Sequence, residues 1–192
     1  MPAYHSSWND DAQGARQVGN VALLPFASRI RGAAPTYHPT EAAQPDIIDE
    51  ALALFRPNSL FRNFEIKGNA DRVLIYLILF IGDCLGKIAQ ARTWTAQDAL
   101  KQLTTHALGH FTLPGEPGFP MNQVFQGPAP GDRVGADAIR AYLVHARQET
   151  VLRLVEQHVY NPQDESTAGG AKPSKWWMAF QKRRFMGKQL GS

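Results

Sequence analysis

Cys84, His106 and His110 are the residues whose types could support nucleophilic or metal chemistry. A reactive cysteine needs a neighbouring base, and a lone cysteine inside an apolar run is normally an inert, small apolar residue. The two histidines are four residues apart, which would place both on one helix face. No third ligand follows at a metal-binding spacing, and a histidine near a helix C-terminus is explained by the helix dipole. We therefore expect neither a catalytic nucleophile nor a metal site.

Residues 82–87 (GDCLGK) place two glycines before a lysine, as phosphate-binding loops do. The segment is one residue shorter than that motif, Ile88 stands where Ser or Thr would bind magnesium, and we expect it inside a helix. Glu149 and Glu156 flank Arg153 at helical spacing, which predicts a surface ion-pair ladder rather than two catalytic carboxylates. No nucleophile-elbow, nucleotide-binding or kinase motif occurs. We predict that the chain is not an enzyme and binds no cofactor.

The C-terminal segment, residues 172–192, has the residue types of a protein interface. We predict one basic, Trp-rich helix here, with Ser174 as its cap. Trp177 and Phe180 either anchor this helix to the core or take part in the contact surface, since large aromatics dominate both. Trp and Arg are enriched at interfaces. The residues expected to contact an acidic partner are Trp176, Lys182, Arg183 and Arg184.

All of the excess positive charge lies near the C-terminus. From residue 169 onward there are six basic residues and no acidic one, and the rest of the chain carries 14 basic against 17 acidic residues. A mildly acidic body predicts no nucleic-acid partner, whereas the tail suits an acidic protein surface or anionic lipid. A single cysteine fits a reducing compartment. The N-terminus lacks a basic start followed by an apolar core, so we expect no signal peptide.

The element that must position these residues is the stretch 69–90. It contains an unbroken run of nine apolar residues, 73–81, and a helix that is apolar on all sides is one that other elements surround. Asn69 is a good N-cap, and Asp71 and Lys87 suit the first and last turns. The run is shorter than the about 20 residues that cross a bilayer. A short buried strand is the alternative interpretation.

The remaining elements are predicted to cover this helix. Residues 1–44 read as an extended arm that packs Val21, Leu23, Leu24 and Phe26 against the body. A first helix should begin near Pro45 and stop at Arg56, because Pro57 blocks continuation. Further helices are expected at about 95–110, where Thr95 and Asp98 form a capping box, at about 136–160, and at the C-terminus. The sequence thus predicts an all-α single domain, 1–192, of about five helices without a strand pair.

Residues 113–122 (LPGEPGFPMN) alternate prolines, which fix φ, with glycines that permit positive φ. This composition predicts a rigid, shaped loop. Pro117 and Phe119 are candidate interface residues by shape, and a role in holding the fold is the alternative.

Several longer strings are specific enough to indicate a family. They occur in this order: MPAYHSS (1–7), GNVALLP (19–25), DEALALF (49–55), ADRVLIYLILFIGDCLGK (70–87), LPGEPGFPMN (113–122), RAYLVHARQETVLRL (140–154) and PSKWW (173–177). Together they resemble subunit 3 of the actin-related protein 2/3 complex over nearly the whole chain. The Gly/Pro-rich segments 126–135 and 163–171 depart most from the family pattern.

The resemblance implies a small all-helical domain with one enclosed helix and no catalytic residues. It implies a structural subunit that packs against the larger actin-related subunit and supports nucleation of branched actin filaments. Expected partners are the actin-related proteins, the other subunits and the actin filament, with no integral membrane contact. The expected location is the cytoplasmic actin cytoskeleton, in cortical actin patches or cell projections. The alternative is a stand-alone helical adaptor that binds anionic lipid or an acidic partner through its basic C-terminal helix.

Overall fold

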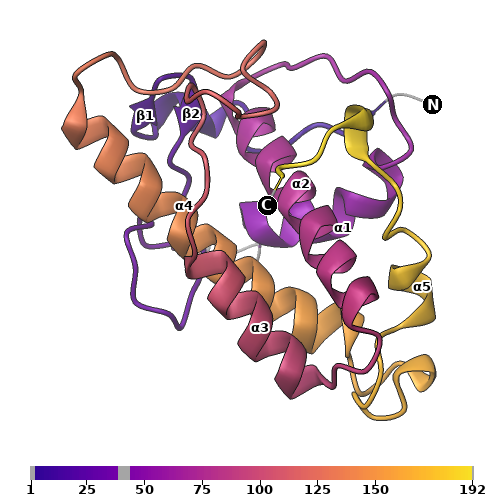
Figure 1. The fold of residues 1–192 in the computed structure, drawn as a ribbon. Helices are drawn as coiled ribbons and strands as arrows, with labels where there is room; N and C mark the ends of the chain where they lie inside the picture. The colour runs from indigo at the N-terminus through magenta and orange to yellow at the C-terminus, as the bar shows by residue number, and fades with distance from the viewer. Residues whose placement is uncertain (1–2, 39–43, 192) are drawn as a thin grey trace.

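The computed structural model describes residues 3–38 and 44–191, and it is mostly helical but not strictly all-α (Figure 1). Five α-helices occur in the described residues: α1 (Ile47–Asn58), α2 (Asn69–Ala91), α3 (Ala96–Leu108), α4 (Arg133–Arg153) and α5 (Lys175–Met178). Shorter helical turns are η1 (Asp11–Gly14), the π-helical η2 (Leu154–Val159), η3 (Glu165–Thr167) and η4 (Phe185–Gly187).

A small hairpin corrects the prediction that no strands pair. Strands β1 (Gln17–Val18) and β2 (Val21–Ala22) are antiparallel, with Val18 opposite Val21. Gly19 makes the turn possible, because its φ is +59° and a Cβ there would lie 2.0 Å from the Gln126 carbonyl oxygen. Such a turn requires glycine. The arm nevertheless packs on the body as predicted: Val21, Leu23, Leu24 and Phe26 are all buried.

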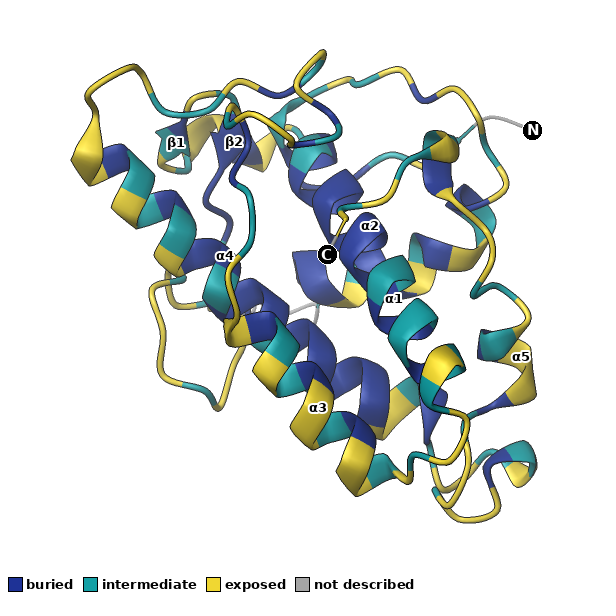
Figure 2. Cartoon of the chain, viewed as in Figure 1, coloured by how far each residue is buried: buried dark blue, intermediate teal, exposed yellow. Residues whose placement is uncertain are grey.

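Helix α2 is the core of the molecule. Each residue from 73 to 81 is at most 4% exposed, and α1, β2, α4 and α3 all contact the helix. Figure 2 shows the first half of the helix as buried, with residues of intermediate exposure in its C-terminal turns. The prediction of an enclosed helix is confirmed, and the strand alternative is wrong. Its N-cap is Gly68 rather than Asn69, which is the first helical residue.

Within the described part of the chain, α2 alone is long and apolar enough to cross a membrane by length and composition. However, 67% of its most apolar window is buried inside the chain. An enclosed core helix satisfies such a test as readily as a membrane span does, so the finding is weak evidence for membrane insertion.

Asp71, expected only to complement the helix dipole, also ties down the start of the chain. Its carboxylate is fully buried and accepts hydrogen bonds from the Ser6 backbone nitrogen (2.7 Å), Asn9 Nδ2 (3.0 Å) and the Lys67 backbone nitrogen (2.9 Å). His5 Nδ1 lies 2.8 Å from the same carboxylate. The N-terminal segment is therefore fastened to the first turn of the central helix.

Helix α1 ends two residues later than predicted. Asp46 caps it by accepting from the Ile48 and Asp49 backbone nitrogens, each at 3.0 Å. Pro57 lies inside the last turn. A proline there removes only one of the final backbone hydrogen bonds, and the Ser59 nitrogen still donates to the Phe55 carbonyl (2.9 Å). The proline therefore does not stop the helix where the sequence suggested.

Helix α3 has the predicted capping box, in which the Thr95 hydroxyl and the Asp98 carboxylate each accept from the other residue's backbone nitrogen. Helix α4 begins three residues before the predicted start, because Asp132 caps it by accepting from the Gly135 nitrogen (2.8 Å). The helix continues as the π-helical turn η2 in place of regular α-helix.

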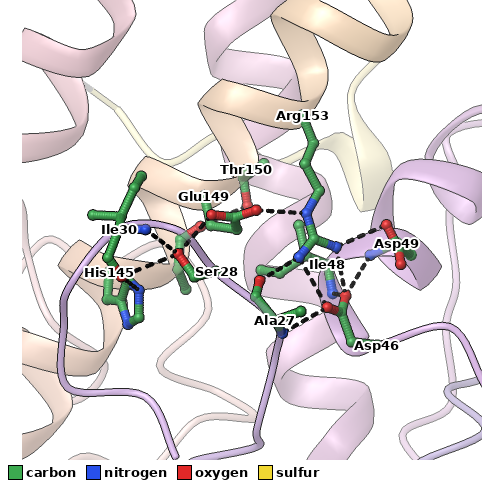
Figure 3. A network of polar contacts seen from close by, with 11 residues as sticks. Ala27, Ser28, Ile30, Asp46, Ile48, Asp49, His145, Glu149, Thr150 and Arg153 are labelled. Carbon is green, nitrogen blue, oxygen red and sulfur yellow. Dashed lines mark hydrogen bonds and ion pairs between the residues drawn. The ribbon is translucent and has the colours of Figure 1, made fainter. Parts of the chain in front are cut away.

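Arg153 lies at the centre of a buried polar network (Figure 3); its predicted pair with Glu149 forms, but it is not at the surface and does not extend to Glu156. Its guanidinium binds both Asp46 oxygens (2.8 and 2.9 Å), Asp49 (2.7 Å), Glu149 (2.7 Å) and the Ala27 carbonyl. All five N–H groups of the arginine are used. The network joins α4 to the first turn of α1 and to the arm.

Glu156, the other predicted member of the ladder, is exposed and takes no part in this network. The prediction missed Asp46 and Asp49, which are remote in sequence but bind Arg153 of α4 in the folded chain. Spacing along one helix cannot reveal partners from another.

The arm is held to α4 by a second group of contacts beside Arg153, visible in Figure 3. Ser28 donates to Glu149 (2.7 Å), His145 Nε2 bonds to the Ile30 carbonyl (2.9 Å), and the Ala34 nitrogen donates to His145 Nδ1 (3.1 Å). These bonds fix the neutral Nε2–H tautomer. Burial lowers the pKa of His145, against a smaller raising effect of its bond to Ile30.

Candidate protein interface

The predicted C-terminal helix is wrong in extent. Helix α5 is four residues long, and the chain then continues through turns to η4, where Met186 has a φ of 54°. Ser174 precedes the helix, but its hydroxyl donates to Asp164 (2.6 Å) and accepts no capping hydrogen bond from a backbone nitrogen of the helix. A longer helix would carry three adjacent cations, Lys182 to Arg184, in a segment without any carboxylate to pair with them at helical spacing.

Two aromatic side chains hold this segment on the body. Trp177 is 5% exposed, stacks on Phe55 of α1 (5.8 Å between ring centroids) and lies beside His158 (5.1 Å). Phe185 is 3% exposed and packs edge-on against Phe64 (5.5 Å). Trp177 is therefore a core anchor, as one of its two interpretations proposed. Phe180, the other predicted anchor, is only half-buried.

Several residues between and beside these anchors are exposed. Trp176 is 59% exposed, with Lys175 Nζ 4.7 Å from the centre of its ring. Lys182, Arg183 and Arg184 are exposed as well, and across residues 3–38 and 44–191 none of the three pairs with a carboxylate. The anchors thus leave one large aromatic and three cations facing outward.

The three cations border a groove of about 1040 Å³ between α2 and the tail. We call this the cationic groove; its basic residues are Lys87, Arg92, Lys182, Arg183, Arg184 and Lys188, and the carboxylate among its lining residues is Asp83. Gly86 lies on its floor, and a Cβ there would meet no atom within 4 Å. The surface suits a partner that carries negative charge and approaches α2 closely.

The loop at 113–122 is shaped by its own hydrogen bonds. Gly115 and Gly118 have φ of +88° and +91°, and the Asn122 side chain accepts from the Gly115 nitrogen and donates to the Glu116 carbonyl, both at 2.8 Å. These contacts agree with the predicted rigid loop. Pro117 is exposed at its surface.

Phe119 points the other way. It is 5% exposed, stacks on Tyr76 of α2 (6.4 Å, 10° between ring planes) and meets Phe125 edge-on (5.2 Å). A side chain buried to this degree presents almost nothing to a second protein. Its place among the predicted surface residues is corrected to the alternative role, that of holding the fold.

The residues considered for chemistry lie in different surroundings. Cys84 is fully buried, and burial raises the pKa of its thiol. His106 Nε2 lies 2.6 Å from Asp83, whereas His110 is exposed. No cluster of metal-ligating side chains occurs among the residues that the structure describes. Residues 82–87 are helical, which a phosphate-binding loop is not.

The fold and the groove together define a mostly helical domain whose exposed features are those of a protein-contact surface. Comparison with known proteins specifies the family. The model described as "P21-Arc: ARP2/3 complex ARPC3 (21 kDa) subunit" matches residues 1–190. The chain is 50% identical to "Actin-related protein 2/3 complex subunit 3" of Saccharomyces cerevisiae over 190 residues, which cover 99% of this chain and 100% of the relative.

Two further relatives carry the same name. That of Schizosaccharomyces pombe is 46% identical (99% of this chain, 100% of the relative), and that of Dictyostelium discoideum is 44% identical (97% and 99%). The chain belongs to the family of subunit 3 of the actin-related protein 2/3 complex. This family is one of structural subunits, and the chain is accordingly not an enzyme.

Proposed function

We propose that this protein is a structural subunit of an actin-related protein 2/3 complex and supports nucleation of branched actin filaments by packing against an actin-related subunit. The observation that carries the proposal is the extent of the family match. It spans residues 1–190 and therefore includes the arm, α2 and the whole cationic tail. A relative that aligns over its whole length at 50% identity supports the same domain arrangement in this chain.

The contact surface is assigned to the C-terminal segment and its groove. Trp176 supplies exposed aromatic area, and Lys182, Arg183 and Arg184 supply charge that the described residues do not neutralise. Interfaces draw on both residue types. Pro117, exposed on the rigid loop, is a second and independent contact candidate.

The partners that follow are the actin-related proteins, the other subunits of the complex and the actin filament, and the location is the cytoplasmic actin cytoskeleton, in cortical patches or cell projections. Neither nucleic acid nor an integral membrane contact belongs to this function. The most apolar helix faces the interior of the chain, and the body outside the tail carries more acidic than basic residues.

Co-purification tests the assignment. A tagged copy of the full chain, recovered from cell extract, should bring down actin-related proteins and the remaining subunits in fixed ratio. Recovery of the chain by itself would contradict the proposal.

A triple alanine variant of Lys182, Arg183 and Arg184 tests the surface. These side chains are exposed, so the free energy of unfolding should change by no more than about 0.5 kcal/mol, while assembly and branch formation weaken. The matched control is alanine at three exposed cations of the body, Arg62, Lys101 and Arg133. Unchanged assembly by the tail variant would remove those three residues from the interface.

The adaptor alternative loses the element on which it depended. That alternative binds anionic lipid or an acidic partner through a basic C-terminal helix, but α5 has only four residues. Flotation of the isolated chain with anionic vesicles distinguishes the two functions: strong, salt-sensitive flotation would favour the adaptor, and none is expected for the complex subunit.

A further inference from the structure

A second, smaller cavity of about 140 Å³ opens between α2, α3 and α4. The segment that follows α3 closes one side, through Phe111 and Thr112, and the end of the tail closes another, through Leu190 and Gly191. Asp83 and Gly191 line both this cavity and the cationic groove. We call the smaller cavity the Arg147 pocket, because that residue reaches it from α4. The two hollows adjoin.

Arg147 is buried and forms no ion pair with any described residue. Its side chain is 3% exposed, and no carboxylate of the described residues lies within ion-pair distance of its guanidinium. It donates to the Tyr76 hydroxyl (3.3 Å) and to the His106 carbonyl (2.8 Å). Nε is the buried side-chain atom that has no partner. An arginine has five N–H donors, so most of the donor capacity is unused.

Two aromatic rings contact the guanidinium. The centre of the guanidinium lies 4.5 Å from the Phe80 ring centroid and 4.2 Å from that of Phe111. Cation–π contacts of this kind hold the plane of the group in place. They leave its edge for hydrogen bonds, and the edge is the part that binds a carboxylate in fork geometry.

The carboxylate that lines the pocket is already engaged. Asp83 Oδ2 lies 2.6 Å from His106 Nε2, and Asp83 is therefore bound to the histidine rather than to Arg147. A buried cation is normally paired, because removing a charge from water is costly unless an opposite charge replaces the solvent. The pocket thus contains an unsatisfied positive group next to an opening.

We propose that the Arg147 pocket receives a carboxylate group, supplied by an acidic side chain of the partner surface that faces the cationic groove. The pocket is small, since about 140 Å³ corresponds to only a few water molecules at about 30 Å³ each. A central buried arginine ringed by exposed contacts is the usual anatomy of an interface hot spot. The identity of the donor as a partner rests on the proposed function, whereas the carboxylate affinity of the pocket does not.

The affinity is tested on the isolated full chain. Acetate serves as the carboxylate probe, with phosphate and chloride as comparison anions at constant ionic strength, and the arginine Nε–H signals are followed by NMR. Acetate should shift the Arg147 signal saturably, and chloride should not. The control is the signal of Arg140, which is on α4 like Arg147 and also contacts the Phe111 ring, but which pairs with Glu116 (3.3 Å). Acetate should not shift the Arg140 signal.

Two results would overturn the assignment. Saturable binding of phosphate more tightly than acetate would assign the pocket to a phosphate ligand. Absence of any saturable response would mean that water satisfies Nε. Thr112→Glu gives a test that leaves Arg147 in place, since it brings a carboxylate to the lining from the chain itself. It should abolish the acetate response, whereas the neutral Thr112→Gln should retain it.

The partner's part is tested in the assembled complex. Arg147→Lys, which keeps the charge but loses the fork, should weaken incorporation of the subunit about tenfold or more; Arg140→Lys is the matched control. Thr112→Glu should weaken incorporation too, because the site is then filled. Acetate binding together with normal incorporation of both variants would overturn the assignment of a partner's carboxylate. A wild-type chain that fails to incorporate at all would instead contradict the proposed function.

Discussion

Two buried arginines of α4 illustrate how a charge can be accommodated inside this fold. Arg153 uses all its donors on three carboxylates and a carbonyl, whereas Arg147 has two neutral acceptors and two aromatic rings. Burial lowers the pKa of Arg153, but its interactions with Asp46, Glu149 and Asp49 together outweigh this effect and the net shift is upward. Each N–H group of Arg153 therefore has a partner within the chain, whereas Arg147 has N–H groups without a partner among the described residues.

Replacing Arg153 with methionine should be strongly destabilising. The substitution keeps apolar bulk but leaves Asp46 and Glu149 as buried, uncompensated carboxylates, so the free energy of unfolding should fall by about 3–5 kcal/mol. Urea denaturation of the full chain measures it. The control Arg183→Met, at an exposed position, should stay within about 0.5 kcal/mol of wild type. A loss below about 1 kcal/mol for Arg153→Met would show that the arm is held by other contacts.

Stability should decline in mild acid because of His145. The folded state lowers its pKa from the ordinary value of 6.5, so the unfolded chain binds a proton first as the pH falls. Stability is therefore complete above about pH 6.5 and is lost progressively below it, by up to about 1 kcal/mol by pH 5.5. Protonated Nδ1 would also face the Ala34 N–H, which now donates to it.

Denaturant melts at pH 7.5 and 5.5 measure the effect, and His145→Gln removes it. The difference between the two pH values should be smaller in that variant than in wild type. His158, whose pKa burial lowers as well with a smaller lowering contribution from Arg56, will account for part of what remains. Equal pH dependence in both proteins would assign the acid sensitivity elsewhere.

At the scale of elements, local signals were sufficient for the interior helices. The apolar run 73–81 specified α2, and the Thr95/Asp98 box fixed the start of α3 to the residue. These signals lie within one turn or one segment, which is why a sequence shows them. The sequence did not predict the hairpin, since strands of two residues give no alternation of polar and apolar positions to detect. Glycine is needed at position 19 because of Gln126, which is over a hundred residues away in the sequence.

The C-terminal segment shows the opposite case. Its aromatic spacing suggested one helix, but Trp177 and Phe185 pack against different parts of the chain, Phe55 of α1 and Phe64 of the segment between α1 and α2. These tertiary contacts of Trp177 and Phe185, and not helix periodicity, determine the conformation of the C-terminal segment. Residue type alone was enough to predict the exposed interface candidates. It could not predict the Arg147 pocket, because the residues that line it come from three helices, the segment after α3 and the end of the tail.

Gly86 of α2 offers a test at this scale. A Cβ there meets nothing within 4 Å, and glycine inside a helix is less favourable than alanine by about 1 kcal/mol. Gly86→Ala should therefore stabilise the isolated chain by about 0.5–1 kcal/mol in thermal or urea unfolding. Gly32→Ala is the contrast, because its Cβ would lie 2.2 Å from the His145 ring, and it should destabilise. A destabilised Gly86→Ala would mean that the groove floor is covered in the free protein.

For the whole molecule, the distribution of charge matters more than its sum of +3. Six basic residues follow position 168, and the rest of the chain carries 17 acidic residues. Lys182, Arg183 and Arg184 nevertheless stay exposed and form no ion pair within the described residues. Trp177 and Phe185 hold the tail in place, so its cations do not fold back onto the acidic body. The separation of charge is thus built into the packing and gives the molecule a directional field.

A directional field should appear in the kinetics of assembly. The rate of association of the full chain with a complex that lacks this subunit should fall by about tenfold or more as ionic strength rises from about 0.05 to 0.5 M, because salt screens exposed charges. The triple alanine variant at 182–184 should associate more slowly at low salt and show a shallower salt dependence. The body variant of Arg62, Lys101 and Arg133 removes the same charge from other elements and should keep the wild-type slope.

The dissociation rate should be much less affected by salt, since rim charges act mainly on encounter. Stopped-flow or surface-based kinetics across the salt series measures both rates. Parallel slopes for all three proteins would show that net charge, and not the placement of the tail, drives the encounter.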